Sequence, residues 1–167
     1  FHDMKYPATF LNTLIATVIG TLGIIVIASM GGYKMARVKT RYSRFCFLFC
    51  IAPMMIPFQS FMLTLVNVAT TLHINGKIWG LAIIYWGLGA PMSIFLYQGF
   101  AKGIPLELEE SALIDGCNQF QVFFHVILPL TKPILVTMAV LAAVWTWNDL
   151  LVALIAIDQM PLMTLTR

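Results

Sequence analysis

Charged side chains are scarce in this sequence. Asp, Glu, Lys and Arg make up 10% of its 167 residues, whereas 60% of the residues are hydrophobic. A soluble domain of ordinary composition carries about 25% charged residues. The shortage excludes a water-soluble fold, because the chain could not cover its surface with polar groups, and indicates that lipid is its solvent. We also expect no nucleic-acid partner, because the net charge of +3 comes from one loop rather than a basic face.

The sequence also lacks the residue clusters that metal binding, catalysis and nucleotide binding require. Its three cysteines and three histidines are scattered, so we interpret them as ordinary packing and loop residues. No Ser/His or His/Glu pair converges at membrane depth, which argues against an intramembrane enzyme. The pair Gly76-Lys77 is followed by Ile78 and has no glycine at position 71, so it is no P-loop. We expect a chain that is not an enzyme and holds no cofactor or metal.

Four apolar segments are long enough to cross a bilayer. A hydrocarbon core of about 30 Å requires about 20 helical residues, each of which rises about 1.5 Å. The first charge-free stretch, Tyr6 to Tyr33, exceeds that length. The sequence therefore predicts an all-α membrane protein with one transmembrane domain over residues 1–167. Its spans are expected near residues 9–31, 45–68, 78–100 and 133–157.

The basic residues predict the orientation of these spans. Half of the ten Lys and Arg residues lie in the loop after the first span, and basic loops are held on the cytoplasmic side. Counting spans from this loop places residues 69–77 outside and residues 102–132 in the cytoplasm. The five bases that carry this inference are Lys34, Arg37, Lys39, Arg41 and Arg44.

The loop at 102–132 contains an acidic island, IPLELEESALIDGCNQFQVFFHVILPL. Pro105 suits the first turn of a helix, and Gly116 suits the position that ends one. Asn118 and Gln121 have the spacing of a capping box, which predicts a second helix after the glycine turn. We expect helices over about 105–115 and from Asn118 to just before Pro129. Four of the seven acids lie here, namely Glu107, Glu109, Glu110 and Asp115.

Two surfaces could receive this pair of short helices. Interfacial helices that lie flat on a bilayer usually carry Lys and Arg towards anionic lipid, whereas no base lies between Lys102 and Lys132. Lipid headgroups would repel the acids. A protein partner with a basic or polar groove fits the charge better.

The island resembles the EAA loop of permease subunits in binding-protein-dependent ABC importers. The resemblance rests on Glu110-Ser111-Ala112, on Asp115-Gly116, and on Val126 followed by Leu128-Pro129. Ser111 stands where the family usually has Ala, and Val126 where it often has Ile. Further segments resemble the maltose-type carbohydrate branch in particular. They are IPLELEE, Met55-Ile56-Pro57, Gly32-Tyr33 through Ala36-Arg37, and Trp147-Asn148-Asp149.

The resemblance implies a fold, a function and partners. It implies a type I ABC importer permease fold in a bacterial-type inner membrane. A subunit of this family has six spans, so the chain, which opens FHDMKYPATF and ends DQMPLMTLTR, is expected to be a fragment with one span missing at each end. The function would be sugar or oligosaccharide import driven by an ATP-binding subunit dimer that carries ATP and Mg. Further partners would be a second homologous permease, an extracytoplasmic sugar-binding protein and membrane lipid.

In the family this loop is the coupling helix that docks in a cleft of the ATP-hydrolysing subunit. The resemblance therefore implies that the island transmits ATPase closure to the spans and that its acids face a protein. The coupling residues expected on this basis are Glu109, Glu110, Ser111, Ala112, Asp115, Gly116, Leu128 and Pro129.

Polar groups at membrane depth are the candidate substrate path. A charge at the centre of a spanning helix costs roughly 2.5 to 3.5 kcal/mol on insertion scales, so Asp149 should not face lipid. Either Asp149 lines the path or it caps a broken helix, and we favour the cap because Leu150 to Ile157 is too short for a full span. Trp145 is interpreted first as an interface anchor, with sugar stacking as its alternative. The candidates are Asn67, Trp145, Asn148 and Asp149.

A secondary transporter or channel subunit with a docking knob is the alternative function. Such proteins provide their own coupling or filter through intramembrane charge pairs, inverted repeats or a carbonyl-lined loop. The sequence shows none of these patterns, so the importer permease is favoured.

Overall fold

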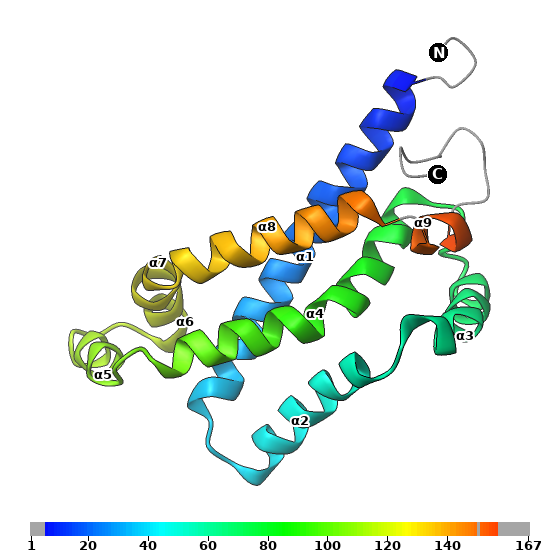
Figure 1. Cartoon of the computed structure of the whole chain (residues 1–167). Coiled ribbons are helices and arrows are strands. Elements are labelled where there is room, and N and C mark those ends of the chain that lie inside the picture. Colours follow the sequence, from blue (N-terminus) through cyan, green and yellow to red (C-terminus); the bar gives the residue numbers. More distant parts are fainter. Residues whose placement is uncertain (1–5, 150, 157–167) are drawn as a thin grey trace.

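Two long helices form the centre of the protein. The computed structural model describes residues 6–149 and 151–156. Within them, α1 (Tyr6–Arg37) and α4 (Ile78–Lys102) pack against each other at an angle (Figure 1). Among the described residues, only these two single helices are long and apolar enough to cross a membrane alone. They correspond to the predicted spans at 9–31 and 78–100.

Close packing joins α1 to α4. Gly23 has no side chain, and a Cβ placed there would overlap the indole of Trp86. The Trp86 indole nitrogen instead donates a hydrogen bond of 3.0 Å to the carbonyl of Ile19. Ile24 and Ala28 of α1 are fully buried, as is Tyr97 of α4. The two helices therefore form the rigid part on which the other elements are placed.

The predicted span at 45–68 is not one straight helix. It consists of α2 (Arg41–Ile51), the 3-10 turn η1 (Ala52–Met55) and α3 (Phe58–Thr71), with a bend of 107° between the two parts. Pro57 causes the break, because it lacks a backbone N–H and disfavours helical backbone at the residue before it. Ile56 is accordingly extended, with φ of −98° and ψ of 122°.

The predicted span at 133–157 is also interrupted. It begins as α8 (Lys132–Asn148), and Asp149 is extended with φ of −75° and ψ of 115° before the short helix α9 (Leu151–Ala156). Residue 157 lies outside the described residues. The helix axis turns by 74° between the preceding segment, from Gln119 to Leu130, and α8. Counting each bent pair as one span gives up to four spans in the described part of the chain.

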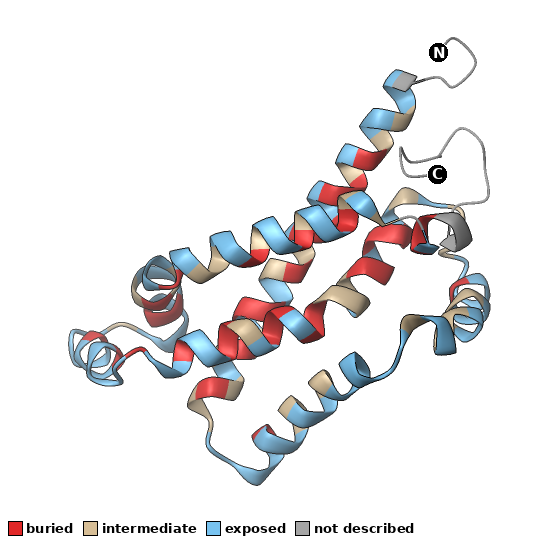
Figure 2. Ribbon diagram, in the orientation of Figure 1, coloured by how far each residue is buried: buried red, intermediate tan, exposed pale blue. Residues whose placement is uncertain are grey.

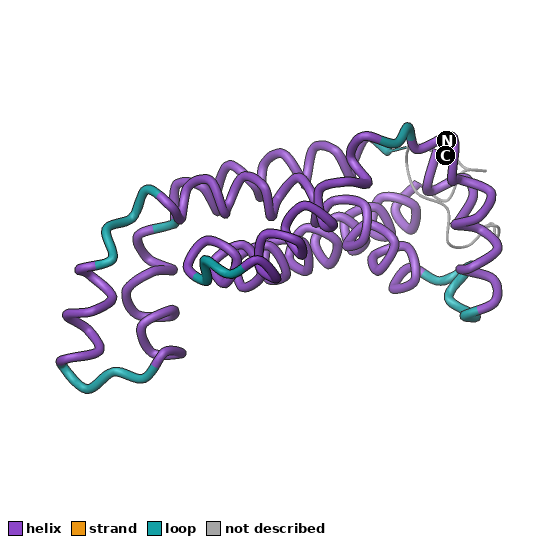
Figure 3. Tube along the Cα trace, turned by 90° about the horizontal axis from the view of Figure 1, so that it is seen from below, coloured by secondary structure: helices purple, strands orange, loops and turns teal. Residues whose placement is uncertain are grey.

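The acidic island forms a compact group of short helices. It contains α5 (Glu107–Ile114), α6 (Gln119–Gln121), the π-helix η2 (Val122–Ile127) and α7 (Leu128–Leu130). We call residues 104–130 the knob. It lies at one end of α4, whereas α3 and α9 lie at the other end (Figure 1). Figure 3 shows the same separation in a second view, in which every regular element among the described residues is a helix.

The two short helices of the knob were predicted, but the end of the second was wrong. The helical segment continues through Pro129 to Leu130 instead of stopping before the proline. Pro129 lies in the first turn of α7, where its missing N–H is tolerated. The six preceding residues wind as a π-helix, which changes the hydrogen-bond register before the proline.

Apolar side chains cover much of the outside. Leu63 of α3, Phe49 of α2 and Val136 of α8 are 74%, 71% and 62% exposed. Figure 2 shows that burial concentrates on α1 and α4, while α2 and α3 are mostly exposed. Lipid solvates such surfaces, so the exposure agrees with a membrane-embedded chain.

Candidate functional site

A glycine turn shapes the knob, as the sequence predicts. Gly116 has φ of +91°, a conformation that glycine adopts at little cost. The backbone N–H of Cys117 donates to the carbonyl of Ala112 at 3.0 Å, and that of Gly116 donates to Leu113 at 3.1 Å. These two bonds form a Schellman motif that ends α5.

The second helix of the knob begins at the predicted capping box. The Asn118 side chain accepts a hydrogen bond of 2.9 Å from the backbone N–H of Gln121. In return, the Gln121 side chain accepts one of 2.8 Å from the backbone N–H of Asn118. The two helices then pack on a small apolar core formed by Ile104, Ala112, Val122, Phe123 and Ile127. The knob is thus a folded unit with a core of its own.

Glu109 faces the interior of the protein. Its residue is only 7% exposed, and its carboxylate accepts hydrogen bonds from Arg37 Nε at 2.6 Å and from the Tyr33 hydroxyl at 2.8 Å. The expectation that all four acids face a partner is therefore wrong for Glu109. Glu109 lies three residues before the buried Ala112, so both occupy the inner face of α5. Glu107, Glu110 and Asp115 are exposed.

The Glu109 contacts join the knob to the end of α1. The Arg37 guanidinium also donates a hydrogen bond of 3.1 Å to the carbonyl of Ile104, where the chain enters the knob. The side chains of Arg37 and Glu109 are only 13% and 10% exposed, so their ion pair is largely desolvated. Removing one partner of such a pair leaves an uncompensated charge and is strongly destabilising. The knob and α1 are therefore expected to move together.

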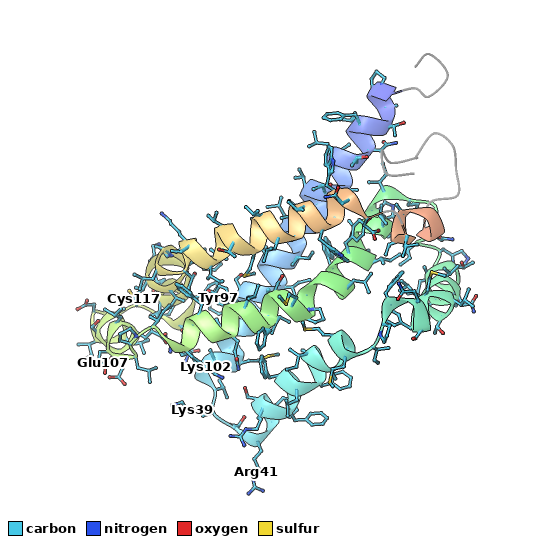
Figure 4. All side chains as sticks on the ribbon, in the orientation of Figure 1. Lys39, Arg41, Tyr97, Lys102, Glu107 and Cys117 are labelled. Carbon is cyan, nitrogen blue, oxygen red and sulfur yellow. The ribbon has the colours of Figure 1, made fainter. Side chains whose placement is uncertain are left out.

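The other side of the knob is joined to α4 and α8. The hydroxyls of Tyr97 in α4 and Thr131 share a hydrogen bond of 3.1 Å, and both residues are fully buried. Thr131 is the residue at which the chain turns from α7 into α8. Figure 4 shows Tyr97 on the α4 side of this junction. A displacement of the knob is therefore mechanically linked to α1, α4 and α8.

The predicted coupling residues divide between the surface and the interior of the knob. Ala112 belongs to the buried core, and Leu128 packs against that core. Two apolar side chains add to the outward surface, since Ile114 is 86% exposed and Phe120 is 72% exposed. The predicted coupling residues on the outside are Glu110, Ser111, Asp115, Gly116 and Pro129.

The structure places Asp149 at the start of α9. Its carboxylate accepts hydrogen bonds from the backbone N–H groups of Val152 at 3.0 Å and Ala153 at 3.3 Å. The Tyr85 hydroxyl donates to the same oxygen at 3.1 Å. The favoured interpretation of Asp149 as the cap of a broken helix is therefore confirmed.

The four candidate path residues do not form one site. Trp145 packs edge-on against Tyr85 at 5.6 Å between ring centroids, and Trp145 and Asp149 both line a cavity of about 330 Å³. Asn148 is exposed and its side chain donates to the carbonyl of Val144 at 2.8 Å. Neither Asn148 nor Asn67 is among the described residues that line this cavity. A role of any of the four in the substrate path stays a prediction.

Three residues at these sites were not predicted to have a role there. Tyr33 and Arg37 hold Glu109, and Tyr85 holds Asp149. Tyr33 and Arg37 lie four residues apart, on one face of α1 beside the expected cytoplasmic end, which is the available signal for a shared partner. Tyr85 is an aromatic residue with a hydroxyl group inside a span, and a buried tyrosine hydroxyl usually has a hydrogen-bond partner.

Replacing Asp149 with alanine should lower the stability of the complete permease by about 1 to 2 kcal/mol, because the cap of α9 loses its acceptor. The matched control is Asp149→Asn, which retains a side-chain oxygen for the two backbone N–H groups. The measurement is thermal unfolding in detergent together with transport in vesicles. Unchanged unfolding of Asp149→Ala with altered transport would contradict the structural role and favour a role in the path.

Sequence comparison finds a matching protein family and several related proteins. Residues 23–167 match the family model described as "Binding-protein-dependent transport system inner membrane component". The chain is 42% identical over 163 residues to the probable starch degradation products transport system permease protein AmyC of Thermoanaerobacterium thermosulfurigenes, covering 98% of this chain and 59% of that protein. It is 32% identical over 159 residues to the melibiose/raffinose/stachyose import permease protein MelC of Bacillus subtilis, covering 95% of this chain and 58% of that protein.

A solved structure has the same fold. It is the crystal structure of a bacterial ABC transporter involved in the import of the acidic polysaccharide alginate, which matches with a TM-score of 0.82 at 23% sequence identity. The match covers 95% of this chain and 55% of that chain. The chain thus spans a little over half the length of these three proteins. The predicted permease fold is confirmed, and because the family model matches most of its residues, the chain belongs to the family of binding-protein-dependent transport system inner membrane components.

Proposed function

We propose that this chain is part of a permease subunit that imports a sugar or oligosaccharide with energy from ATP hydrolysis on a separate subunit. The related proteins AmyC and MelC are named for starch degradation products and for melibiose, raffinose and stachyose, which supports a carbohydrate substrate. ATP and Mg²⁺ would bind to a dimer of the ATP-hydrolysing subunit. A second permease and an extracytoplasmic binding protein would complete the transporter.

The main observation that supports this proposal is the structure of the knob. Its outward surface presents the exposed acids Glu110 and Asp115 beside the exposed side chains of Ile114 and Phe120. Its inward surface holds the buried Glu109 against Arg37 and Tyr33. A partner that binds the outward surface would therefore act on α1 through the inward one. This two-sided arrangement is what a coupling element requires.

The coupling step follows from the links of the knob to three helices. Closure of the ATPase dimer would displace the docked knob, and the Arg37–Glu109 pair would carry α1 with it. The Tyr97–Thr131 hydrogen bond would carry α4 and the start of α8. Because α4 extends to the elements around Asp149, a shift at the knob end would reach the opposite end of the bundle (Figure 1).

The transport activity is testable in proteoliposomes. The complete permease, reconstituted with its ATPase, its second permease and its binding protein, should accumulate radiolabelled maltooligosaccharide only when ATP is supplied. Accumulation without ATP, or accumulation that does not require the ATPase subunit, would contradict an ATP-driven importer.

Cysteine labelling tests the orientation. In a permease whose native Cys46, Cys50 and Cys117 are replaced by serine, Lys39→Cys and Lys77→Cys place thiols at two exposed loop positions. The proposed orientation puts position 39 in the cytoplasm and position 77 outside. An impermeant thiol reagent added to intact spheroplasts should label position 77 and leave position 39 unlabelled until the cells are opened. Reversed labelling would place the knob outside and contradict the docking proposal.

A further inference from the structure

A basic groove lies where α1 ends, α2 begins and α4 meets the first residues of the knob, 104–107. The groove has a volume of about 1070 Å³. Four exposed bases line it, namely Lys39, Arg41, Arg44 and Lys102. Among the described residues that line the groove, Glu107 is the one acid. Arg37 also lines it but is engaged by Glu109. Figure 4 shows Lys39, Arg41, Lys102 and Glu107 at this end of the protein.

We propose that this groove binds the phosphate headgroup of an anionic phospholipid. The excess of bases over acids is complementary to a phosphate, and basic pockets between spanning helices on the cytoplasmic side suit anionic headgroups. The proposal rests on the proposed function, in which the knob end of the permease and therefore the groove lie at the cytoplasmic surface of the bilayer.

The surface next to the groove suits the acyl chains of such a lipid. Helix α2 begins in the groove at Arg41 and continues with exposed aromatic and aliphatic side chains. Phe45 and Phe49 are 64% and 71% exposed, and they stack with 6.2 Å between ring centroids. Leu48 is 55% exposed and also lines the groove, so it joins the basic and apolar parts. A phosphate among the bases would therefore leave its acyl chains along α2.

A lipid fits the groove better than the ATPase partner does. The partner surface that suits the knob must be basic or polar, because the exposed residues Glu110 and Asp115, which do not line the groove, are acidic. The same partner surface would be repelled by the four bases of the groove. Lys102 also lies over the ring of Phe47, with 5.8 Å from its Nζ to the centroid, which keeps this charge at the groove rather than at the knob.

Native mass spectrometry of the complete transporter tests the proposal. The protein is delipidated in detergent and titrated with dioleoyl phosphatidylglycerol, with dioleoyl phosphatidylcholine and with inorganic phosphate. The parent should retain phosphatidylglycerol with at least a ten-fold preference over phosphatidylcholine. The double variant Arg44→Gln/Lys102→Gln should bind it about thirty-fold more weakly, which is the loss of two bases at about 1 kcal/mol each.

The matched control is Lys34→Gln/Lys132→Gln, which removes two exposed bases that do not line the groove. This control should bind phosphatidylglycerol within about three-fold of the parent. Equal loss in both double variants would overturn the proposal, because it would reveal a general effect of surface charge. Displacement of phosphatidylglycerol by inorganic phosphate at the same concentration would overturn it in favour of a free-anion site.

Retention of the ATPase separates this proposal from the proposed function. The groove variant should still capture the ATPase subunit in a pull-down while it loses phosphatidylglycerol. Loss of the ATPase from the groove variant, with retention in the control variant, would assign the groove to partner docking and overturn the lipid site. Failure of lipid binding in a parent that still couples ATP hydrolysis to uptake would overturn the lipid site alone.

Discussion

Replacing Glu109 with alanine is expected to destabilise the complete permease by about 3 to 5 kcal/mol, the usual cost of removing one partner of a buried ion pair. The variant leaves the Arg37 guanidinium, whose side chain is 13% exposed, without its carboxylate. The Tyr33 hydroxyl loses its acceptor as well. Water cannot fully replace either contact at this burial. The measurement is the unfolding free energy of the detergent-solubilised protein.

The neighbouring acid supplies the control. Glu110→Ala removes an equal charge one residue away on the exposed face of α5 and should change the unfolding free energy by less than about 0.5 kcal/mol. Equal effects of Glu109→Ala and Glu110→Ala would contradict the inward position of Glu109.

A double variant separates the pair from its surroundings. Arg37→Met/Glu109→Leu replaces both charges with apolar side chains of similar volume, a change that is often neutral when the pair is buried. It should recover part of the stability lost in Glu109→Ala, because the Tyr33 hydroxyl and the Ile104 carbonyl still lose their partners. The double-mutant cycle should show a coupling energy above about 1 kcal/mol. Additive effects of the two single substitutions would contradict a direct contact.

Features governed by neighbouring residues could be predicted from the sequence. The positive φ of Gly116 and the reciprocal Asn118–Gln121 box depend on residues within one turn, and both were predicted. The cap at Asp149 was also the favoured interpretation, because the short apolar segment after it could not continue a full span. Such local rules are physical constraints that tertiary packing rarely overrides.

Features governed by distant contacts could not be predicted in this way. Glu109 and Arg37 are 72 positions apart, and no local rule distinguishes Glu109 from Glu110 as the acid that turns inward. The bend of 107° before α3 was missed although Pro57 was visible, because hydropathy measures total apolar length and not the direction of the axis. The passage of the second knob helix through Pro129 depends on a π-helix, which has no simple sequence signal.

The largest effect on coupling is expected from Gly116→Val. A β-branched residue adopts a positive φ only at a cost of about 1 to 3 kcal/mol, so the turn between α5 and α6 should rearrange. A Cβ at this position would meet no atom within 4 Å, so the effect comes from the backbone conformation rather than from overlap. The control is Gly116→Asn, which fills the same open space but tolerates the left-handed conformation better. Gly116→Val should misplace the knob surface while the spans remain inserted.

Reversal of one exposed charge tests the same surface without changing the backbone. Glu110→Lys places a base where a basic or polar partner groove is expected, and like charges across an interface weaken association. Because Glu110 is exposed, the change should affect stability far less than docking. The new base in the first turn of α5 opposes the helix dipole, which costs about 0.3 to 1 kcal/mol. Glu110→Gln is the control that removes the charge without reversing it, and it should give an intermediate effect.

The most direct test of the coupling knob is capture of the ATPase subunit by the detergent-solubilised permease, measured together with sugar-stimulated ATP hydrolysis. The parent and Gly116→Asn should retain the ATPase and show stimulated hydrolysis. Gly116→Val and Glu110→Lys should lose most of the captured ATPase and the stimulation while membrane insertion is unchanged. If both variants capture the ATPase and couple hydrolysis to uptake as the parent does, the knob is not the coupling element.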